Sequence, residues 1–429
     1  MSNAPARLFA IWRTDLPRPV LVLQGATALS FFGTGLILPF EIIYLHEVRG
    51  FSTATAGLVV ATVMATGAAL TLPAGALLDR FSAKSLLITG NLVNAVGYGG
   101  LAFVHRPWQG FVCSAIGGAG FGFVATASQV LTLTLVPPEQ RAASTAMRRV
   151  STNFGTGFGA TVAGFVVAAA HHHLYAFQGL YLFDTVTFAA FALVVLVGVP
   201  NPGVTNAAST SHGGQGFRAV GRDRLLWALI AGNFVLVMIG GSFFQSVLPP
   251  FATEHSPVGA GEIGIVLFIN TFFVVVAQLP ATRVIARMRR THALFATSAT
   301  YAIGLLAVLL ATLTGSTLAG TTALAAVAII IAVAECAQFI VLGPLVAEIA
   351  PPHLLGRYMS LYQLSFLAGI ALGPAAGGVL LGTSPDTIWW GGAFAMALTG
   401  AGFLRLGNRI PDPLIPTKPP LLQAASEAT

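Results

Sequence analysis

Long apolar runs follow one another along the whole chain, and they restrict its fold more than any other feature. A helix needs about 20 apolar residues to cross the hydrocarbon core of a bilayer, and twelve runs approach or exceed that length. Only 8% of the residues are charged, whereas soluble domains carry roughly a quarter, so most of the surface cannot face water. The sequence therefore predicts an all-α membrane protein with twelve transmembrane helices in a lipid bilayer. We expect them at residues 20–45, 54–78, 85–104, 109–135, 143–170, 178–199, 225–250, 262–285, 293–314, 321–347, 358–382 and 387–404.

The twelve runs form two sets of six, separated by a polar stretch rich in glycine, serine and asparagine. The expected organisation is an N-terminal six-helix bundle at 1–199, a flexible cytoplasmic linker at 200–223 and a C-terminal six-helix bundle at 224–408. The last segment, 409–429, is rich in proline, and we expect a disordered cytoplasmic tail there.

The second half of the chain repeats elements of the first. Pro137-Pro138 precedes the fifth run and Pro351-Pro352 precedes the eleventh, 214 positions later. At the same offset, three glycines match three glycines: Gly155 and Gly369, Gly159 and Gly373, Gly164 and Gly378. The sequence therefore predicts two pseudo-symmetric bundles, and two such halves around a midplane site are typical of secondary transporters.

The basic residues are distributed unevenly between the expected loops. With twelve spans both termini lie on one side of the membrane, and of the 21 Lys and Arg residues only Arg49 and Arg106 fall on the other side. Cytoplasmic loops carry an excess of Lys and Arg, so we expect a multi-pass protein of the cell inner (plasma) membrane with both termini in the cytoplasm. The formal net charge of +7 follows from this topology, and we expect no nucleic-acid partner.

Three acidic residues lie inside the expected spans, namely Glu41, Asp184 and Glu335. A carboxylate within the membrane is costly and is a candidate functional group. Burial disfavours its charged form, so such a group can exchange protons. Proton coupling requires a group whose protonation favours one conformation over another, and we expect Glu335 and Glu41 to serve this purpose. For Asp184 we expect a structural hydrogen-bonding role.

The loop after the second run reads GALLDRFSAK, residues 75–84. It resembles the cytoplasmic loop signature of the major facilitator superfamily, G-x-L-x-D-R-x-G-R-K. The matching residues are Gly75, Leu77, Asp79, Arg80 and Lys84, while Ser82 and Ala83 depart from it. The resemblance implies a latch that closes the cytoplasmic side, with Gly75 allowing two helix ends to touch and Asp79 facing the start of the eleventh span or pairing with Arg141 or Arg148. The alternative is a solvated charge run in a tight turn.

A second motif occurs in the eleventh run as GIALGPAAGG and in the fifth as GTGFGATVAG. The pattern resembles the drug–proton antiporter signature that is typical of the fifth helix in exporters of this superfamily, although Ala160 replaces its proline here. Glycines at four-residue spacing form a flat groove for a neighbouring helix. The resemblance and ordinary small-residue packing both predict an interface between the halves. The glycine motif comprises Gly155, Gly159, Gly369, Gly373, Pro374, Gly377 and Gly378.

The tenth run, AECAQFIVLGPLVAEIAPP, resembles the tenth helix of multidrug exporters, which carries a membrane-embedded glutamate. Helices 1, 4, 7 and 10 line the cavity in that fold, so the resemblance places Glu335 and Glu41 on the cavity from opposite halves. We expect Arg148 to extend to the cytoplasmic surface. Arg149 is expected either to do the same or to line the cavity, where it would bind an anionic substrate group or pair with a glutamate. Asn270 and Gln338 are expected to orient a polar substrate group or to join helices by hydrogen bonds.

The resemblance covers most of the chain and implies a secondary active transporter, similar to bacterial multidrug:proton antiporters. We expect alternating access and proton-coupled efflux of lipophilic or drug-like small molecules by a monomer. No metal is expected, because the histidine triplet 171–173 lacks converging ligands. No enzyme activity and no cofactor besides the proton gradient are expected either. The alternative is an importer of a sugar, amino acid or organic acid, which predicts more paired polar residues in the cavity helices. A receptor or enzyme would need a catalytic cluster or a soluble domain.

Overall fold

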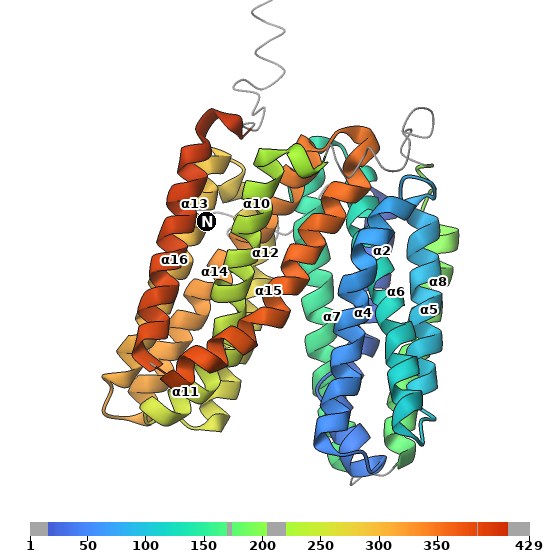
Figure 1. Ribbon diagram of the computed structural model, residues 1–429, viewed down its shortest axis with the longest axis horizontal. Coiled ribbons are helices and arrows are strands. Elements are labelled where there is room, and N and C mark those ends of the chain that lie inside the picture. Colours follow the sequence, from blue (N-terminus) through green and yellow to red (C-terminus); the bar gives the residue numbers. More distant parts are fainter. Residues whose placement is uncertain (1–15, 170–173, 204–219, 384, 411–429) are drawn as a thin grey trace, which may run out of the picture.

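The computed structural model describes residues 16–169, 174–203, 220–383 and 385–410, and these residues form helices and connecting turns without a strand. Figure 1 shows two groups of helices side by side, one from each half of the sequence. The histidine triplet, most of the expected linker and nearly all of the expected tail lie outside the described residues.

The N-terminal group consists of α2 (Arg18–Ile37), α3 (Glu41–Ile43), the π-helical η1 (Tyr44–Val48), α4 (Thr53–Leu77), α5 (Ala83–Leu101), α6 (Pro107–Thr134), the short η2 (Pro138–Gln140), α7 (Arg141–Ala169) and α8 (Leu174–Gly198). The C-terminal group consists of α10 (Arg224–Val235), the π-helical η3 (Leu236–Gly241) and η4 (Phe243–Val247), α11 (Leu248–His255), α12 (Ala260–Ile285), α13 (Arg290–Thr312), α14 (Thr317–Ile349), the short η5 (Pro352–Leu354), α15 (Leu355–Thr383), α16 (Pro385–Leu406) and the short η6 (Gly407–Arg409).

Ten helical stretches among the described residues are long and apolar enough to cross a membrane. The other two expected spans correspond to α5 and α7, which are not in this set. Both are more polar than their neighbours, since α5 carries the buried Asn91 and Asn94 and α7 carries Arg148 and Arg149. The chain is thus an all-helical protein with many apolar helices, while the count of twelve spans stays a prediction.

Two of the expected spans are not single helices. The first is interrupted at 38–40, where Pro39 separates α2 from α3, because proline cannot donate the backbone hydrogen bond that continues a helix. The seventh runs from α10 through η3 and η4 into α11, and π-helical turns often occur at functional sites. Apolar periodicity does not distinguish such interruptions from a straight helix, so the sequence did not reveal them.

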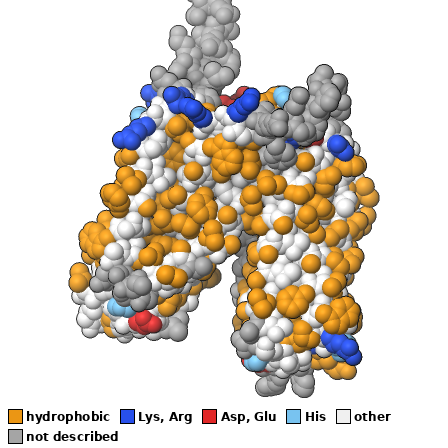
Figure 2. All heavy atoms as spheres, in the orientation of Figure 1, with side chains coloured by type: hydrophobic (Ala, Val, Ile, Leu, Met, Phe, Trp, Pro, Cys, Tyr) orange, Lys and Arg blue, Asp and Glu red, His pale blue; other side chains and the backbone are white. Residues whose placement is uncertain are grey.

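The two groups meet at one end of the molecule and separate at the other. Figure 2 shows Lys and Arg gathered at the end where the groups meet, which we call the basic end, and a cleft that opens at the opposite end. At the basic end a buried apolar cluster continues from one group into the other, through Leu78, Leu131 and Met359. The fold therefore places the bottom of the cleft midway between the two ends.

The glycine motif packs within each group and not between the groups. A methyl group at Gly159 would overlap the carbonyl oxygen of Phe32 on α2, and one at Gly373 would overlap the side chain of Ser242, between η3 and η4. The helices α7 and α15 do lie at the boundary between the groups, since α7 contacts α12 and α14 and α15 contacts α4 and α6. The glycines themselves are not at this boundary, because Gly155, Gly159, Gly369, Gly373 and Gly377 face the first and seventh helical stretches of their own halves. The pseudo-symmetry itself is preserved, since α7 contacts α2 as α15 contacts η3 and η4.

Substitution of Gly159 by alanine is expected to lower the free energy of unfolding by about 1–3 kcal/mol, because the added methyl group forces apart two closely packed helices. Gly157 is the matched control on the same helix, since a methyl group there would meet no atom within 4 Å. Thermal unfolding in detergent should show Gly159→Ala clearly destabilised and Gly157→Ala close to wild type. Equal stability of the two variants would contradict the packing described for α2 and α7.

Candidate functional site

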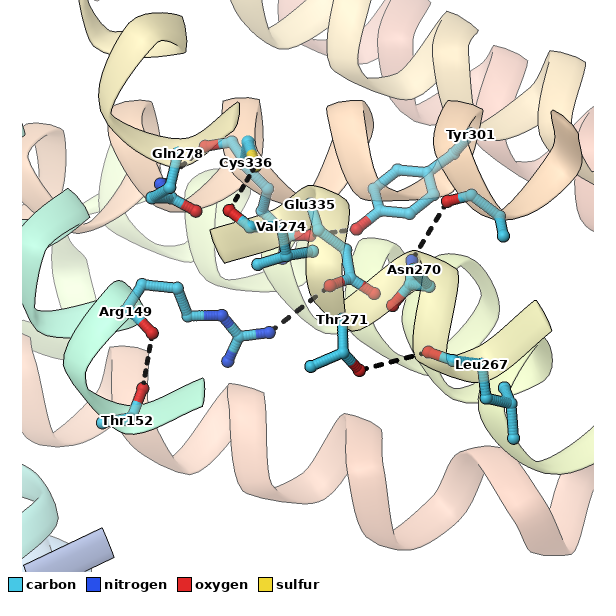
Figure 3. Close-up of polar contacts among 12 residues, drawn as sticks. Arg149, Thr152, Leu267, Asn270, Thr271, Val274, Gln278, Tyr301, Glu335 and Cys336 are labelled. Carbon is cyan, nitrogen blue, oxygen red and sulfur yellow. Dashed lines mark hydrogen bonds and ion pairs between the residues drawn. The ribbon is translucent and has the colours of Figure 1, made fainter. Parts of the chain in front are cut away.

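An ion pair joins the two groups of helices midway between the basic end and the cleft opening. Arg149 on α7 places its Nη2 atom 3.4 Å from Oε2 of Glu335 on α14. Figure 3 shows the guanidinium group directed at the Glu335 carboxylate, which is 5% exposed, against 23% for the arginine side chain. The structure thus brings together two of the predicted site residues, 186 positions apart in the chain.

The pair is held loosely. Charge-assisted N–H···O bonds are typically about 2.7–2.9 Å long, so 3.4 Å is a weak contact. The other carboxylate oxygen of Glu335, Oε1, is buried and accepts no hydrogen bond. Arg149 also contacts an aromatic ring, since its guanidinium carbon lies 4.2 Å from the ring centroid of Phe339. A cation over the face of an aromatic ring is attracted to it. Arg149 can therefore keep its position when Glu335 changes its charge.

A cavity of about 260 Å³ adjoins the ion pair between α7 and the C-terminal group. Eight of its fourteen lining residues are polar or charged, namely Arg149, Asn153, Ser242, Gln245, Ser246, Tyr301, Glu335 and Gln338. The apolar part of the wall includes Phe339 and Phe366, whose rings form an edge-to-face pair with centroids 5.6 Å apart. This lining suits a small ligand that has both polar groups and an apolar body.

Gln338 lines the cavity, but its amide group forms hydrogen bonds with residues of neighbouring helices. Its Oε1 accepts a hydrogen bond from the Tyr301 hydroxyl at 2.9 Å, and its Nε2 donates to Oδ1 of Asn233 at 3.0 Å. Asn233 in turn donates to Ser365 at 2.8 Å. These bonds connect α13, α14, α10 and α15 behind the cavity wall. The sequence analysis missed Tyr301, Asn233 and Ser365, although a polar residue such as Asn233 inside an apolar run was a usable signal.

Asn270 lies on α12 and does not border the cavity. Its Nδ2 donates to the backbone oxygen of Ala328 on α14 at 3.2 Å. Figure 3 shows Asn270 beside α14. In this position Asn270 joins two helices by a hydrogen bond, which was one of the two functions expected for it; the other was to orient a substrate group.

Glu41 and Asp184 lie in the N-terminal group, away from the cavity beside Glu335. Glu41 is buried at the start of α3, and its Oε1 forms no hydrogen bond. Asp184 is fully buried on α8, where Oδ1 accepts a hydrogen bond from Thr187 at 3.2 Å. Neither residue lines the cavity beside Glu335, so the structure does not bring Glu41 to Glu335.

The predicted loop signature lies at the basic end, where α4 of one group meets α15 of the other. Asp79 Oδ2 is 2.7 Å from Nη2 of Arg357, the third residue of α15. Gly75 permits this approach, because a side chain there would overlap Ser360. Asp79 thus faces the start of α15, as expected. Its partner is Arg357, whereas the sequence analysis considered Arg141 and Arg148 as partners. We call Gly75, Asp79 and Arg357 the latch.

The two basic signature residues, Arg80 and Lys84, do not belong to the latch contact. Lys84 donates to the backbone oxygens of Leu196 and Val199 at 2.8 and 2.7 Å, so it caps the end of α8, where a cation is favoured by the helix dipole. Arg80 is exposed, and its charge acts on Asp79 from the solvent side. The described residues contain no group of three or more His, Cys, Asp or Glu side chains that could hold a metal ion.

Comparisons with known proteins identify the family of this chain. The family model of the Major Facilitator Superfamily matches residues 25–256 and 230–426. The chain belongs to the major facilitator superfamily. It is 23% identical over 375 residues to the uncharacterized MFS-type transporter YqjV of Bacillus subtilis (strain 168), which covers 86% of this chain and 88% of that protein.

Two further similarities concern smaller parts or the fold alone. The multidrug resistance protein MdtH of Klebsiella pneumoniae (strain 342) is 25% identical, but over only 34% of this chain and 36% of that protein. The E. coli fucose:proton symporter FucP superposes with a TM-score of 0.74 over 90% of this chain and 98% of that chain, at 17% identity. This superfamily member is accordingly a multi-pass membrane transporter, and its substrate does not follow from these matches.

Burial raises the pKa of Asp79, while the charge and hydrogen bond of Arg357 act in the opposite direction. Protonation removes the charge that Arg357 binds, so the latch is expected to weaken as the pH falls through this raised pKa. Replacement by asparagine mimics the protonated form. Since a hydrogen bond to a charged group contributes about 1.5–3 kcal/mol, Asp79→Asn should increase the open population at the basic end by roughly tenfold or more.

The rate of alkylation of a single cysteine introduced near the latch measures this opening. Glu139→Gln is the control, because Glu139 is an exposed carboxylate between α6 and α7. The expected outcome is a faster rate in Asp79→Asn and an unchanged rate in Glu139→Gln. Because the thiolate is the reacting form, each rate is divided by that of a free thiol at the same pH, and this ratio should no longer depend on pH in Asp79→Asn. A ratio that still changes with pH in Asp79→Asn would assign the titrating group elsewhere.

Proposed function

We propose that this superfamily member is a proton-coupled secondary transporter that works by alternating access, with the Arg149–Glu335 pair as the coupling element. The observation that carries the proposal is that this ion pair connects the two groups of helices beside a cavity. A change of charge on Glu335 therefore alters a contact between the two halves directly. Proton coupling needs such a link between a protonation state and a conformation.

The proposal includes the membrane arrangement. We take the two groups of helices as two six-helix bundles with twelve spans, embedded in the inner membrane with both termini in the cytoplasm. The basic end is then the cytoplasmic end, in accord with the excess of Lys and Arg in cytoplasmic loops. The latch closes that end and the cleft faces outward, so the structure corresponds to the outward-facing arrangement of the carrier.

The coupling step follows from the charges at the pair. While Glu335 is ionised it attracts Arg149 across the boundary between the bundles. A proton that enters through the outward cleft and binds Glu335 removes this attraction, and the Arg149 guanidinium stays on Phe339. The contact between the bundles is weakened, which favours the return to the inward-facing arrangement. Glu41 and Asp184 are two further buried carboxylates, both in the N-terminal group, and we propose an auxiliary role in proton binding for them.

We propose export of small lipophilic or amphipathic molecules as the direction of transport. The partial match with a multidrug resistance protein supports export, and the Phe339–Phe366 wall supports an apolar ligand body. A second candidate is the proton-coupled import of a small metabolite, which the polar lining of the cavity favours. In both cases we propose a monomer that needs no cofactor besides the proton gradient.

Glu335→Gln is expected to lower proton-driven uptake of drug-like probes into everted vesicles by about tenfold or more, because the amide cannot exchange a proton. Exchange of labelled for unlabelled probe without a gradient should persist, since the cavity remains intact. Glu348→Gln is the matched control, because Glu348 lies at the end of the same helix, α14, and pairs with Arg290. It should transport like wild type.

Three results would change the proposal. Undiminished proton-driven uptake in Glu335→Gln would move the coupling site to Glu41 and Asp184, which Glu41→Gln then tests. Loss of exchange together with gradient-driven uptake would mean that Glu335 binds the substrate rather than the proton. Transport in right-side-out vesicles only would favour the importer.

A further inference from the structure

A second cavity, of about 180 Å³, lies at the basic end between the two groups of helices. One side of its wall consists of η2 and the start of α7, and the other consists of the last parts of α12 and α14 and the start of α13. It shares no lining residue with the cavity beside Glu335 or with the latch. Because its two sides belong to different groups, the second cavity is complete only while the basic end is closed.

The second cavity lies where the internal repeat of the chain would place a second latch. The PAG at 73–75 recurs 207 positions later as the PAT at 280–282, and the double proline before α7 recurs 214 positions later before α15. At these offsets the residues that meet at the latch have apolar counterparts that border the second cavity, namely Ile285 for Leu78, Ala286 for Asp79 and Ala142 for Gly356. Ala143 stands in the place of Arg357. One contact at the basic end is therefore held by an ion pair, and its counterpart contains a cavity.

The charged side chains around the second cavity leave one cation without a partner. Arg290 and Glu348 border it from the C-terminal group and form an ion pair with each other. Arg141 borders it from the start of α7, and no ion pair joins Arg141 to a described carboxylate. The Nε atom of Arg141 is buried and forms no hydrogen bond. Glu139 also borders the cavity, but it is exposed to the solvent, where salt screens its charge. These charges favour an anionic ligand.

The remaining lining residues of the second cavity are apolar. They include Met288 after α12 and Ile340, Val341 and Pro344 of α14. A cavity of about 150 Å³ can hold benzene, so a cavity of about 180 Å³ has room for one substituted ring but not for a lipid with its acyl chains. An apolar wall with a small number of polar groups is typical of a site for a small molecule.

We propose that the second cavity binds a small organic anion, one ring or branched chain that carries a carboxylate or sulfonate, and that the bound molecule holds the basic end closed. Its anionic group pairs with Arg141 of the N-terminal group, because guanidinium N–H donors match the oxygens of such groups. Its apolar body packs on α12 and α14 of the C-terminal group. One molecule then joins the two halves, as the Asp79–Arg357 pair joins them at the latch.

Such a ligand is an inhibitor of the cycle. Opening of the basic end separates the two sides of the second cavity, so the ligand binds the closed arrangement better and shifts the equilibrium toward it. The inhibitory site is distinct from the cavity beside Glu335, since the two have separate lining residues. The effect on transport rests on the proposed function, whereas the effect on opening does not.

The test uses toluene-4-sulfonate, and benzyltrimethylammonium is the control probe of similar size and opposite charge. The measurement is the alkylation rate of a single cysteine near the latch, in the full chain in neutral detergent. Saturating sulfonate should slow this rate by about tenfold, within the usual range of coupling between two sites, and the ammonium ion should leave it unchanged.

Two variants locate the effect. Arg141→Gln removes the cation and Ala286→Leu fills part of the cavity, so both should abolish the slowing by sulfonate. Ala286 is exposed and Arg141 is half-buried, so both variants should unfold at the wild-type temperature. Arg287→Gln is the matched control, because Arg287 is an exposed arginine beside Ala286 that does not border the cavity. It should preserve the slowing.

An alkylation rate that sulfonate does not change in wild type, or slows equally in Arg141→Gln and Ala286→Leu, would overturn the inference. Equal slowing by the two probes would also overturn it, as would slowing by added phosphatidylglycerol but not by sulfonate.

Proton-driven uptake into everted vesicles separates this inference from the proposed function. Sulfonate should inhibit uptake in wild type but not in Arg141→Gln. Slowing of alkylation that depends on Arg141, in a chain whose uptake is unaffected by Glu335→Gln, would refute the coupling role of Glu335 and support the inhibitory site. Uptake that requires Glu335 but is not inhibited by sulfonate would refute the inhibitory site alone.

Discussion

The cost of holding a charge in an apolar interior governs the arrangement of this protein. Two ion pairs join the two groups of helices, Arg149 with Glu335 between the two ends and Asp79 with Arg357 at the basic end. Each of these pairs takes one partner from each half of the chain. Such an ion pair is lost when one partner loses its charge, so the relative position of the two halves depends on ionisation. A purely apolar interface would not have this dependence.

The sequence predicted the elements better than the contacts. The apolar runs located the helical stretches because membrane spans need length and apolarity, which are properties of a segment alone. The break at Pro39 and the π-helical turns of η3 and η4 were missed, since they depend on local backbone geometry. The glycines of α7 and α15 were expected between the halves, but helical spacing alone does not tell which neighbour a small-residue face meets.

The candidate site was predicted in its residues, and pairing with a glutamate was one of the alternatives given for Arg149. Glu335 was selected because a carboxylate within an apolar run is unusual, and this signal is contained in the sequence. Its pairing with Arg149 required the relative placement of α7 and α14. The same holds for Arg357, which joins Asp79 only because Gly75 lets α4 and α15 approach.

The close contact of α7 with α2 at Gly155 and Gly159 has a mechanical consequence for the Arg149 site. Backbone packed against backbone, without side chains between, leaves little room for sliding, and the corresponding contact joins α15 to η3 and η4 in the other half. Arg149 therefore cannot shift along its own helix axis without displacing α2. Each half moves its charged groups as one solid body, and the movement that the cycle needs takes place at the boundary that the Arg149–Glu335 and Asp79–Arg357 ion pairs cross.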